Sequence, residues 1–505
     1  NDTTTNTGWT NTTTTTIQNY TTTLTIQNGT NNPGTNVEIK FYANYSNAAF
    51  GSIGRLIWNT TILGGTDAYS AAFYDCDKDG IKECVAAGTS SGGDDVYLLN
   101  PDGSVQNQYN TGPVTQIISG DLNNDTYENE FAIASSAIRW YNHSGQIATY
   151  GVGSQAIVLC DLTGDGIPEI AGGGSNEIGA AYANGTQLWY RSITGYAREL
   201  ACADVTGDGI NDVAYVEGDY LYVLYGQNGS TAYQSALIDA ISVSAIDLDN
   251  DGKKDELVVG TTWNGGNEIH AFNNTNITEI WQTNKFSNSA IRDIAVGDFD
   301  GDGYEDDFAA VSPNEYLYVF SANMTGAYEI FNKSGTTAEH FNYIYAADIN
   351  DDGTPEIIGG NSNNYTSVFT TSGAEILRYT TEDKIGDSNS YGKHSPLATG
   401  DIDGDGILEL AVASYDGRVY VIQEVSCTAS FNDSTSYNMT WNSTLRKWQV
   451  GKTFTSPGTY SYNVTCSKGG YETQTASSTI TISPSPVVRT VNITPTTAYT
   501  NTTLT

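Results

Sequence analysis

The chain has 505 residues, which exceeds a typical single domain and predicts two or three domains. Its 58 Asp and Glu residues outnumber its 21 Lys and Arg residues, and the formal charge of −37 argues against nucleic acid and anionic lipid surfaces as partners. No apolar run approaches the roughly 18 residues of a transmembrane helix, so we expect no direct membrane insertion. Since the sequence begins at Asn1 without a Met, we expect that a signal peptide has been removed.

The first segment, residues 1–50, is rich in Thr and Asn and contains two plausible strands, TTLTIQ and NVEIKFYANY. Two strands alone are not stable in water. We therefore expect this segment to pack on a neighbouring domain or to join another subunit by strand exchange.

An Asp-rich segment then recurs eight times, with successive starts about 40 to 53 residues apart. The eight copies begin at Asp75, Asp121, Asp161, Asp204, Asp247, Asp298, Asp348 and Asp401. Each lies between two short apolar strands and is followed by a third strand, a Gly-containing turn and a fourth strand. This period predicts an all-β fold, an eight-bladed β-propeller over residues 54–424.

The two ends of the repeat array complement each other. The copy from Asp401 is followed by two strands but no further one, whereas residues 54–62, which precede the first copy, look like a fourth strand. We expect this strand to complete the last blade and close the ring, because closure removes exposed sheet edges.

The repeated segment, D-x-[DNT]-x-D-G-x-x-[DE], suits Ca²⁺, which takes six to eight oxygen ligands on a sharply turned backbone. Positions 1, 3, 5 and 9 supply side-chain oxygens and position 7 a carbonyl, which predicts up to eight bound Ca²⁺ ions. Loop by loop, the expected ligands are Asp75, Asp77, Asp79, Ile81 and Glu83; Asp121, Asn123 and Asp125; Asp161, Thr163, Asp165, Ile167 and Glu169; Asp204, Thr206, Asp208, Ile210 and Asp212; Asp247, Asp249, Asp251, Lys253 and Asp255; Asp298, Asp300, Asp302, Tyr304 and Asp306; Asp348, Asn350, Asp352, Thr354 and Glu356; and Asp401, Asp403, Asp405, Ile407 and Glu409.

The eight loops are unequal, and we name each by its first Asp. The loops from Asp75, Asp247, Asp298 and Asp401 hold four carboxylates each. The Asp121 loop departs furthest, because Thr126 replaces the Gly and Asn129 stands at position 9 with Glu130 beside it. We expect that loop to be weak or empty. Acidic turns without metal are the alternative for the whole set, although their carboxylates would then repel one another.

The six cysteines predict three disulfides in an oxidising compartment: Cys76 with Cys84, Cys160 with Cys202, and Cys427 with Cys466. Buried free thiols are the alternative for the first two pairs. Abundant Asn-x-Ser/Thr acceptors indicate a glycosylated extracellular protein. The acceptors include Asn19, Asn28, Asn44, Asn59, Asn142, Asn184, Asn228, Asn276, Asn323, Asn332, Asn364, Asn432, Asn438, Asn442 and Asn463.

Residues 427–484 have the strand pattern and the Cys and Trp content of an Ig-like or PKD-like β-sandwich. Residues 487–505 look like the start of a further β domain or an exchanged strand.

The repeats resemble the FG-GAP/VCBS family of calcium-binding propellers, which includes the integrin α-chain, over roughly residues 54–424. In that family such loops join the first two strands of a blade and bind Ca²⁺, which implies the ligands given above. The Phe-Gly…Gly-Ala-Pro signature is absent here. The acidic, Lys-poor, Tyr/Thr/Asn-rich composition is similar to that of archaeal surface proteins.

No catalytic set is evident, since the four His residues lie near no nucleophile or ligand motif and the tight carboxylate clusters belong to the loops. We therefore expect a non-enzymatic, structural or adhesive glycoprotein at the cell surface, a subunit of a filament or surface layer. Its expected partners are like subunits, other surface proteins and glycans. A lyase-like propeller acting on polysaccharides and a monomeric receptor for carbohydrate or protein are the alternatives.

Overall fold

The computed structural model describes residues 55–482 with short gaps, and the flanking strands 23–25, 37–44 and 491–493. The gaps are residues 63–66, 90–95, 237, 263–267, 275–276, 284–289, 313–315, 335–340, 350–352, 386–394, 403, 405–407, 424–425, 443–446, 455 and 468–473. In some of the described strands only the backbone is described. Every regular element in the described part is a strand, and no helix there is long and apolar enough to cross a membrane.

The chain divides into two compact units. One unit is Leu56–Glu424, and the other combines Asn1–Arg55 with Val425–Thr505.

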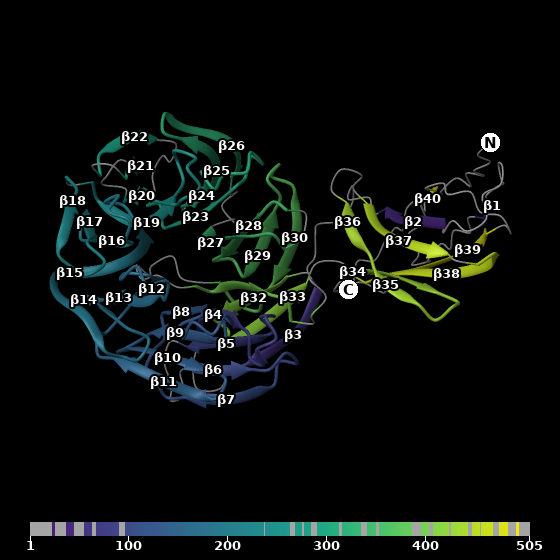
Figure 1. Ribbon diagram of the computed structural model, residues 1–505, viewed down its shortest axis with the longest axis horizontal. Coiled ribbons are helices and arrows are strands. Elements are labelled where there is room, and N and C mark those ends of the chain that lie inside the picture. The colour runs from purple at the N-terminus through teal and green to yellow at the C-terminus, as the bar shows by residue number, and fades with distance from the viewer. Residues whose placement is uncertain are drawn as a thin grey trace. The chain divides into compact units, whose positions relative to one another are not determined.

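The larger unit is a ring of antiparallel sheets (Figure 1). Its four-stranded sheets are β4–β7 (Ala68–Tyr74, Cys84–Thr89, Val96–Leu99, Val105–Tyr109); β8–β11 (Gln116–Gly120, Glu130–Ala134, Ile138–Asn142, Gly145–Tyr150); β19–β22 (Ala240–Ile246, Glu256–Thr261, Ile269–Phe272, Glu279–Thr283); β23–β26 (Asp293–Gly297, Asp307–Val311, Tyr316–Asn323, Gly326–Ser334); β27–β30 (Phe341–Ala347, Glu356–Asn361, Tyr365–Phe369, Glu375–Thr380); and β31–β33 (Leu397–Gly400, Glu409–Ser414, Arg418–Gln423) with β3 (Arg55–Thr61). A seven-stranded sheet contains β12–β18 (Ala156–Cys160, Glu169–Gly173, Ser175–Ala181, Gln187–Ala203, Asp212–Glu217, Tyr220–Leu224, Thr231–Gln234). Its strand β15 is 17 residues long and ends one group of four strands while starting the next. This arrangement is a β-propeller.

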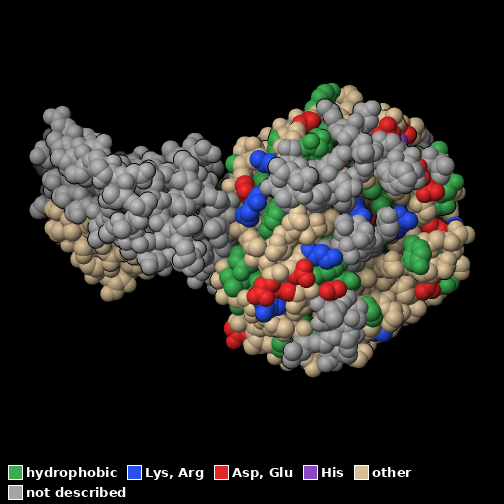
Figure 2. Space-filling model, turned by 180° about the vertical axis from the view of Figure 1, so that it is seen from behind, with side chains coloured by type: hydrophobic (Ala, Val, Ile, Leu, Met, Phe, Trp, Pro, Cys, Tyr) green, Lys and Arg blue, Asp and Glu red, His purple; other side chains and the backbone are tan. Residues whose placement is uncertain are grey.

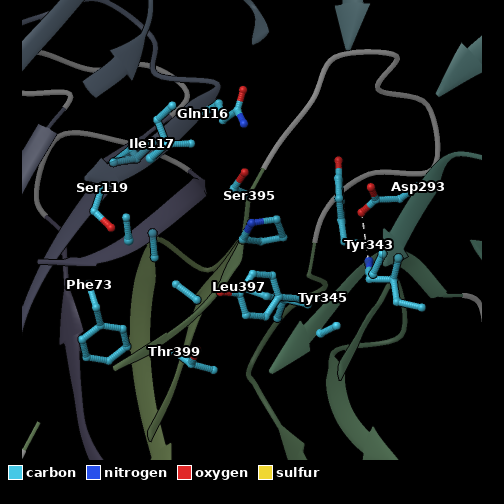
Figure 3. Close-up of a pocket in the computed structure, with 18 of the residues that line it drawn as sticks. Phe73, Gln116, Ile117, Ser119, Asp293, Tyr343, Tyr345, Ser395, Leu397 and Thr399 are labelled. Carbon is cyan, nitrogen blue, oxygen red and sulfur yellow. Dashed lines mark hydrogen bonds between the residues drawn. The ribbon is translucent and has the colours of Figure 1, made fainter. Parts of the chain in front are cut away.

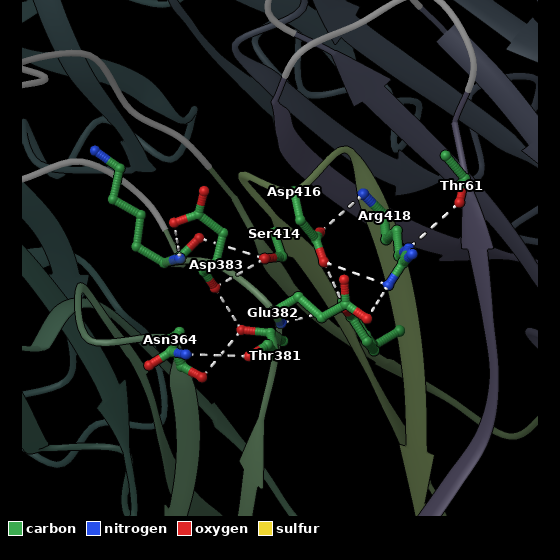
Figure 4. Close-up of polar contacts among 10 residues, drawn as sticks. Thr61, Asn364, Thr381, Glu382, Asp383, Ser414, Asp416 and Arg418 are labelled. Atoms are coloured by element: carbon green, nitrogen blue, oxygen red, sulfur yellow. Dashed lines mark hydrogen bonds and ion pairs between the residues drawn. The ribbon is translucent and has the colours of Figure 1, made fainter.

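Strand β3, the first strand of the ring in sequence, lies beside β33, the last one (Figure 4). The Arg418 guanidinium of β33 donates a hydrogen bond to the Thr61 hydroxyl at 3.3 Å and pairs with Glu382 at 2.5 Å. The backbone N–H of Ile62 also donates to the Gly417 carbonyl at 2.8 Å. Chain segments more than 350 residues apart therefore share one sheet.

A tryptophan contact links neighbouring groups of four strands. The indole N–H of Trp189 donates to the Gly226 carbonyl at 2.7 Å, and that of Trp281 donates to the Asn323 carbonyl at 2.8 Å. Trp58 on β3 makes the same contact with the Pro101 carbonyl of the first sheet, at 2.8 Å. Strand β3 is thus tied to the next sheet in the same way as β15 and β22 are tied to their neighbours.

Apolar side chains between adjacent sheets form the core. The second strand of a four-stranded sheet is buried along its whole length, as in β5, β9, β20 and β24. Between the first and last sheets, for example, Phe73 and Val85 pack with Ala411 and Val421. A side chain also joins the innermost strands of neighbouring sheets, because the Ser70 hydroxyl of β4 accepts a hydrogen bond from the Ile117 N–H of β8 at 2.8 Å.

The smaller unit has two sheets. One contains, in order, β1 (Thr23–Thr25), β39 (Gln474–Ile482), β38 (Gly458–Ser467), β34 (Ser426–Phe431) and β35 (Ser436–Asn438); the other contains β36 (Thr440–Asn442), β37 (Lys447–Phe454), β2 (Val37–Asn44) and β40 (Val491–Ile493). The Phe431 and Phe454 rings, one from each sheet, lie 6.0 Å apart. Strands from residues 1–50 and 487–505 therefore belong to the same unit as residues 427–484, with β1 pairing in parallel with β39 and β2 with β40.

Candidate metal centres in the Asp-rich loops

All eight Asp-rich loops occupy the same place in the fold, between the first and second strand of a group of four. They connect β4 to β5, β8 to β9, β12 to β13, β15 to β16, β19 to β20, β23 to β24, β27 to β28 and β31 to β32. Loops that follow one another meet in two places, where the Asp75 N–H donates to the Glu128 carbonyl and the Asp247 N–H to the Glu305 carbonyl. Figure 2 shows one face of the molecule, on which small groups of Asp and Glu side chains lie beside Lys and Arg.

In seven of the eight loops, backbone N–H groups of the described residues hold the first Asp. In the Asp298 loop, Oδ1 accepts the Gly301 N–H at 2.7 Å and Oδ2 accepts the Gly303 N–H at 2.9 Å. The bond from position 6 to position 1 recurs in the loops from Asp75, Asp121, Asp161, Asp204, Asp247 and Asp348. Position 5 accepts the N–H of position 7 in the same way, as Asp302 does from Tyr304 at 3.0 Å. The loop backbone thus fixes its own carboxylates.

In three loops the carboxylate oxygens converge so closely that one cation can bind them together. They lie within 4.8 Å of one another in the group of Asp75, Asp77, Asp79 and Glu83, in that of Asp247, Asp249 and Asp251, and in that of Asp298, Asp300 and Asp302. An all-oxygen donor set of this kind fits Ca²⁺ rather than a thiolate- or imidazole-binding metal.

The last acidic residue of the loop does not always stand at position 9. Glu169, at position 9, is buried at the start of β13, and its carboxylate accepts the Leu162 N–H at 2.9 Å. In the Asp247 and Asp298 loops that contact belongs to position 10: Glu256 accepts from Leu248 at 2.9 Å and Asp307 from Phe299 at 2.7 Å.

The predicted ligands Asp255 and Asp306 therefore stand one residue before the place that Glu169 occupies. Asp255 instead accepts a hydrogen bond from the Asn274 amide at 2.8 Å. The Asp121 loop has the longer form too, since Glu130 accepts from Leu122 at 3.2 Å.

Several buried oxygens of these loops have no hydrogen-bond partner among the described residues: Glu83 Oε2, Glu256 Oε1, Thr163 Oγ1 and Asp306 Oδ1. A buried oxygen without a partner is costly, so these atoms are where a cation would be favourable. The residues present thus fit a calcium ion.

The electrostatics of the loops agree with this fit. Burial raises the pKa of Glu83, Glu256 and Asp307 to about 7, and Asp carboxylates of the same loop add to the rise. Burial likewise raises the pKa of Asp306 to about 7 and that of Asp212 to about 6. These groups therefore hold protons more tightly than exposed carboxylates do, unless a cation replaces the proton.

The Asp121 loop differs in three described features. Thr126 has the left-handed φ of 76° that Gly adopts at this position in other loops. The Asn123 amide donates to Glu130 Oε1 at 2.7 Å, so both Glu130 oxygens have donors. The Lys78 ammonium of the preceding loop pairs with Asp125.

Some predicted ligands lie outside the described residues: Asn350, Asp352, Asp403, Asp405 and Ile407. Of the same two loops, Glu356 and Glu409 are buried at the starts of β28 and β32 and accept the N–H groups of Ile349 and Ile402 at 3.1 and 2.8 Å. They therefore occupy the same place as Glu169.

Two disulfides lie close to the loops. Cys76 is bonded to Cys84 across the Asp75 loop, and Cys160 of β12 to Cys202 of β15, which joins neighbouring groups of strands. Cys427 stands directly opposite Cys466 in the register of β34 and β38, where the side chains are outside the described part.

Described acceptor asparagines lie at the surface or near it. Asn59, Asn184, Asn228, Asn332, Asn432 and Asn463 are exposed, and Asn142, Asn323 and Asn364 are half-buried. The side chains of Asn19, Asn28, Asn44, Asn276, Asn438 and Asn442 are outside the described residues.

A cavity of about 470 Å³ lies between the innermost strands β4, β8, β23, β27 and β31 (Figure 3). Polar lining side chains bind the backbone of a neighbouring strand: Asp293 accepts the Ile344 N–H at 2.9 Å, and Gln116 accepts the Ile157 N–H at 2.8 Å. Lys82 also contributes to the lining and pairs with Glu128.

Comparison with known proteins places the larger unit among β-propellers. Residues 348–412 match the model of the FG-GAP-like repeat, which confirms the predicted resemblance for that segment. No curated protein matches the chain.

Among solved structures, the chain is similar to Sqt1 of Saccharomyces cerevisiae, with a TM-score of 0.56 and 9% identity over 74% of this chain and 99% of that one. It is also similar to Sqt1 of Chaetomium thermophilum bound to the N-terminus of ribosomal protein L10 (TM-score 0.53, 14% identity, 73% and 100% covered) and to the Dos1 propeller (0.51, 10%, 73% and 95%). At such identities these likenesses show the fold alone.

Proposed function

We propose that the chain is an extracellular, non-enzymatic scaffold, an eight-bladed FG-GAP-like propeller that Ca²⁺ stabilises, joined to an Ig-like sandwich. It binds like subunits, other surface proteins or glycans within a cell-surface assembly such as a filament or surface layer. The blade number is supported by the seven-stranded sheet, which counts as two blades because β15 serves both. The sandwich is supported by the contact between the Phe431 and Phe454 rings of its two sheets.

The recurrent loop geometry is the observation that carries the calcium part. In each of the Asp75, Asp247 and Asp298 loops, backbone N–H groups fix the first carboxylate while others converge within 4.8 Å. Such carboxylates repel one another when no cation is bound, so a bound cation stabilises the folded chain by linkage.

Thermal unfolding of the full chain, with calcium and with excess chelator, tests this. At a calcium concentration 100-fold above Kd, each occupied site adds about 2.7 kcal/mol to the free energy of unfolding, so the Tm is expected to fall clearly in chelator. Magnesium is the control, because its octahedral preference fits these loops poorly. An unchanged Tm in chelator would contradict the calcium role.

The assembly part has its own test, electron microscopy and light scattering of the full chain with calcium present. We expect ordered assemblies or concentration-dependent association. Isolated monomers at all accessible concentrations would contradict this part and leave the calcium part standing.

The proposal includes no bond cleavage. A polysaccharide lyase would require basic groups that converge on the cavity, and in its described lining the Lys82 ammonium is already paired with Glu128. We expect no unsaturated products from acidic polysaccharides, and their appearance would contradict a purely binding role.

A further inference from the structure

Two pairs of neighbouring loops are linked in the same way. The first loop pair is the Asp75 loop with the Asp121 loop, and the second loop pair is the Asp247 loop with the Asp298 loop. In the first, Lys82 pairs with Glu128, and the Asp75 N–H donates to the Glu128 carbonyl at 3.0 Å. In the second, Lys254 pairs with Glu305, and the Asp247 N–H donates to the Glu305 carbonyl at 3.2 Å.

The pairs differ at position 4 of the leading loop, which is Lys78 in the first and Asn250 in the second. Both residues have a left-handed backbone, with φ of 68° and 62°, so both side chains leave the loop from the same kind of turn. The longer Lys78 side chain reaches the following loop and places its ammonium on Asp125, at position 5. Asp302, at position 5 of the Asp298 loop, belongs instead to one of the three converging carboxylate groups.

The Asp121 loop is also supplied with donors of its own. The Asn123 amide donates to Glu130 Oε1, and this buried carboxylate feels the positive charge of Lys78 as well. Beside it, Asn129 is buried and its Oδ1 has no partner among the described residues. The loop thus keeps the acidic framework of a cation site but already has a positive charge.

We propose that the Lys78 ammonium is the resident cation of the Asp121 loop and takes the place that Ca²⁺ takes in the other loops. A fixed ammonium on Asp125 repels a second cation, and its tethering to the neighbouring loop keeps its local concentration high. This inference rests on the proposed calcium function and makes the Asp121 loop a latent calcium site.

Counting bound calcium per full chain by native mass spectrometry, at one fixed free calcium concentration, tests the inference. Lys78→Met removes the charge while keeping an aliphatic side chain, and we expect it to bind one ion more than the unmodified chain. Asp125→Ala should leave the count unchanged, whereas the matched Asp302→Ala should lower it by one. All three changes lie in exposed or half-exposed loop positions, and the Tm of each variant checks its folding.

A lysine introduced at the matching position of the second loop pair gives a second test. Asn250→Lys introduces the same side chain at the same kind of turn in the second loop pair, and we expect it to displace one ion, from the Asp298 loop. An unchanged count in Lys78→Met, or a lower count in Asp125→Ala, would overturn the inference and leave calcium binding intact. An unchanged count in Asp302→Ala would instead overturn the calcium proposal, and this inference with it.

Discussion

The first and second loop pairs share backbone links and a Lys–Glu contact, yet the carboxylates of their second loops have different surroundings. In the Asp121 loop, Lys78 and the Asn123 amide supply positive charge and donors. In the Asp298 loop, three Asp carboxylates converge. The difference teaches that the acidic loop is primarily a backbone motif, fixed by the first Asp and its N–H donors. On the proposal above, the cation is a separate requirement, which Lys78 meets in the Asp121 loop.

The largest expected effect is a pH dependence of the metal-free chain, to which both loop pairs contribute. Glu130 and Glu256, with ordinary pKa values near 4.5, and Asp307, with one near 3.8, are raised to about 7 by burial. The folded state therefore binds protons that the unfolded state releases in this window. The stabilisation is fully present below about pH 4 and is lost as the pH rises through 7, by up to about 1.4 kcal/mol per pH unit per group.

In excess chelator we thus expect a higher Tm at about pH 5 than at about pH 7.5, with several kcal/mol between the two free energies of unfolding. Saturating calcium should flatten or reverse this trend, because the cation replaces the proton. A Tm that rises with pH in chelator would contradict the raised pKa values.

Glu256→Gln and Glu130→Gln sharpen the comparison by the sign of their effects. Glu256→Gln keeps an acceptor for the Leu248 N–H and removes a charge that costs about 3 kcal/mol to bury above pH 7, so it should stabilise the metal-free chain. With calcium the same change removes a ligand and should destabilise the chain by about 2 kcal/mol.

Glu130→Gln removes the same kind of buried charge but also one acceptor, because both Glu130 oxygens have N–H donors, so its effect on stability should be smaller than that of Glu256→Gln. The effect should be the same with and without calcium, because no calcium is lost from the Asp121 loop. Chemical denaturation with and without chelator measures all four values. An equal difference between the two conditions for the two variants would show that the two loops bind calcium alike.

The repeated loops, their place between the first two strands and the strand before the first repeat are visible in the sequence, because Asp, Gly and apolar runs recur together. The residue that closes each loop is less visible. Alignment on the first Asp selected Asp255 and Asp306, whereas the structure places Glu256 and Asp307 at the strand start. The apolar run begins one residue later in these loops than after Glu169, and alignment on that run would have found them.

Contacts between loops could not be predicted from the sequence. The pairing of Lys78 with Asp125, for example, depends on which blades are neighbours and on the left-handed turn at Lys78. The strand pairing in the smaller unit could not be predicted from the sequence either. Short Thr-rich strands carry no signal for their partners, so the pairing of β2 with β37 and β40 emerges only from the tertiary structure.

A smaller effect on stability is expected at position 6, which is Thr126 in the Asp121 loop and Gly303 in the Asp298 loop. Thr126 is β-branched at a φ of 76°, a conformation that costs about 1 kcal/mol or more, so Thr126→Gly should stabilise the chain by about 1 kcal/mol. The reverse change, Gly303→Thr, should destabilise by a similar amount. An added Cβ at Gly303 would meet no atom within 4 Å, so this cost is purely conformational. Effects of the same sign in both variants would contradict this explanation.

The smallest effect is expected from the Lys–Glu contacts that the two loop pairs share. Lys82 with Glu128 and Lys254 with Glu305 are partly exposed ion pairs, which contribute about 0–1 kcal/mol each and weaken in salt. Lys82→Met and Lys254→Met should therefore each lower the free energy of unfolding by less than about 1 kcal/mol, and equally. Denaturation at low and high salt measures both. A clearly larger loss for Lys82→Met would show that Lys82 contributes more to the first loop pair than a surface ion pair with Glu128. Lys78, which supplies the charge on Asp125, is unchanged in this variant.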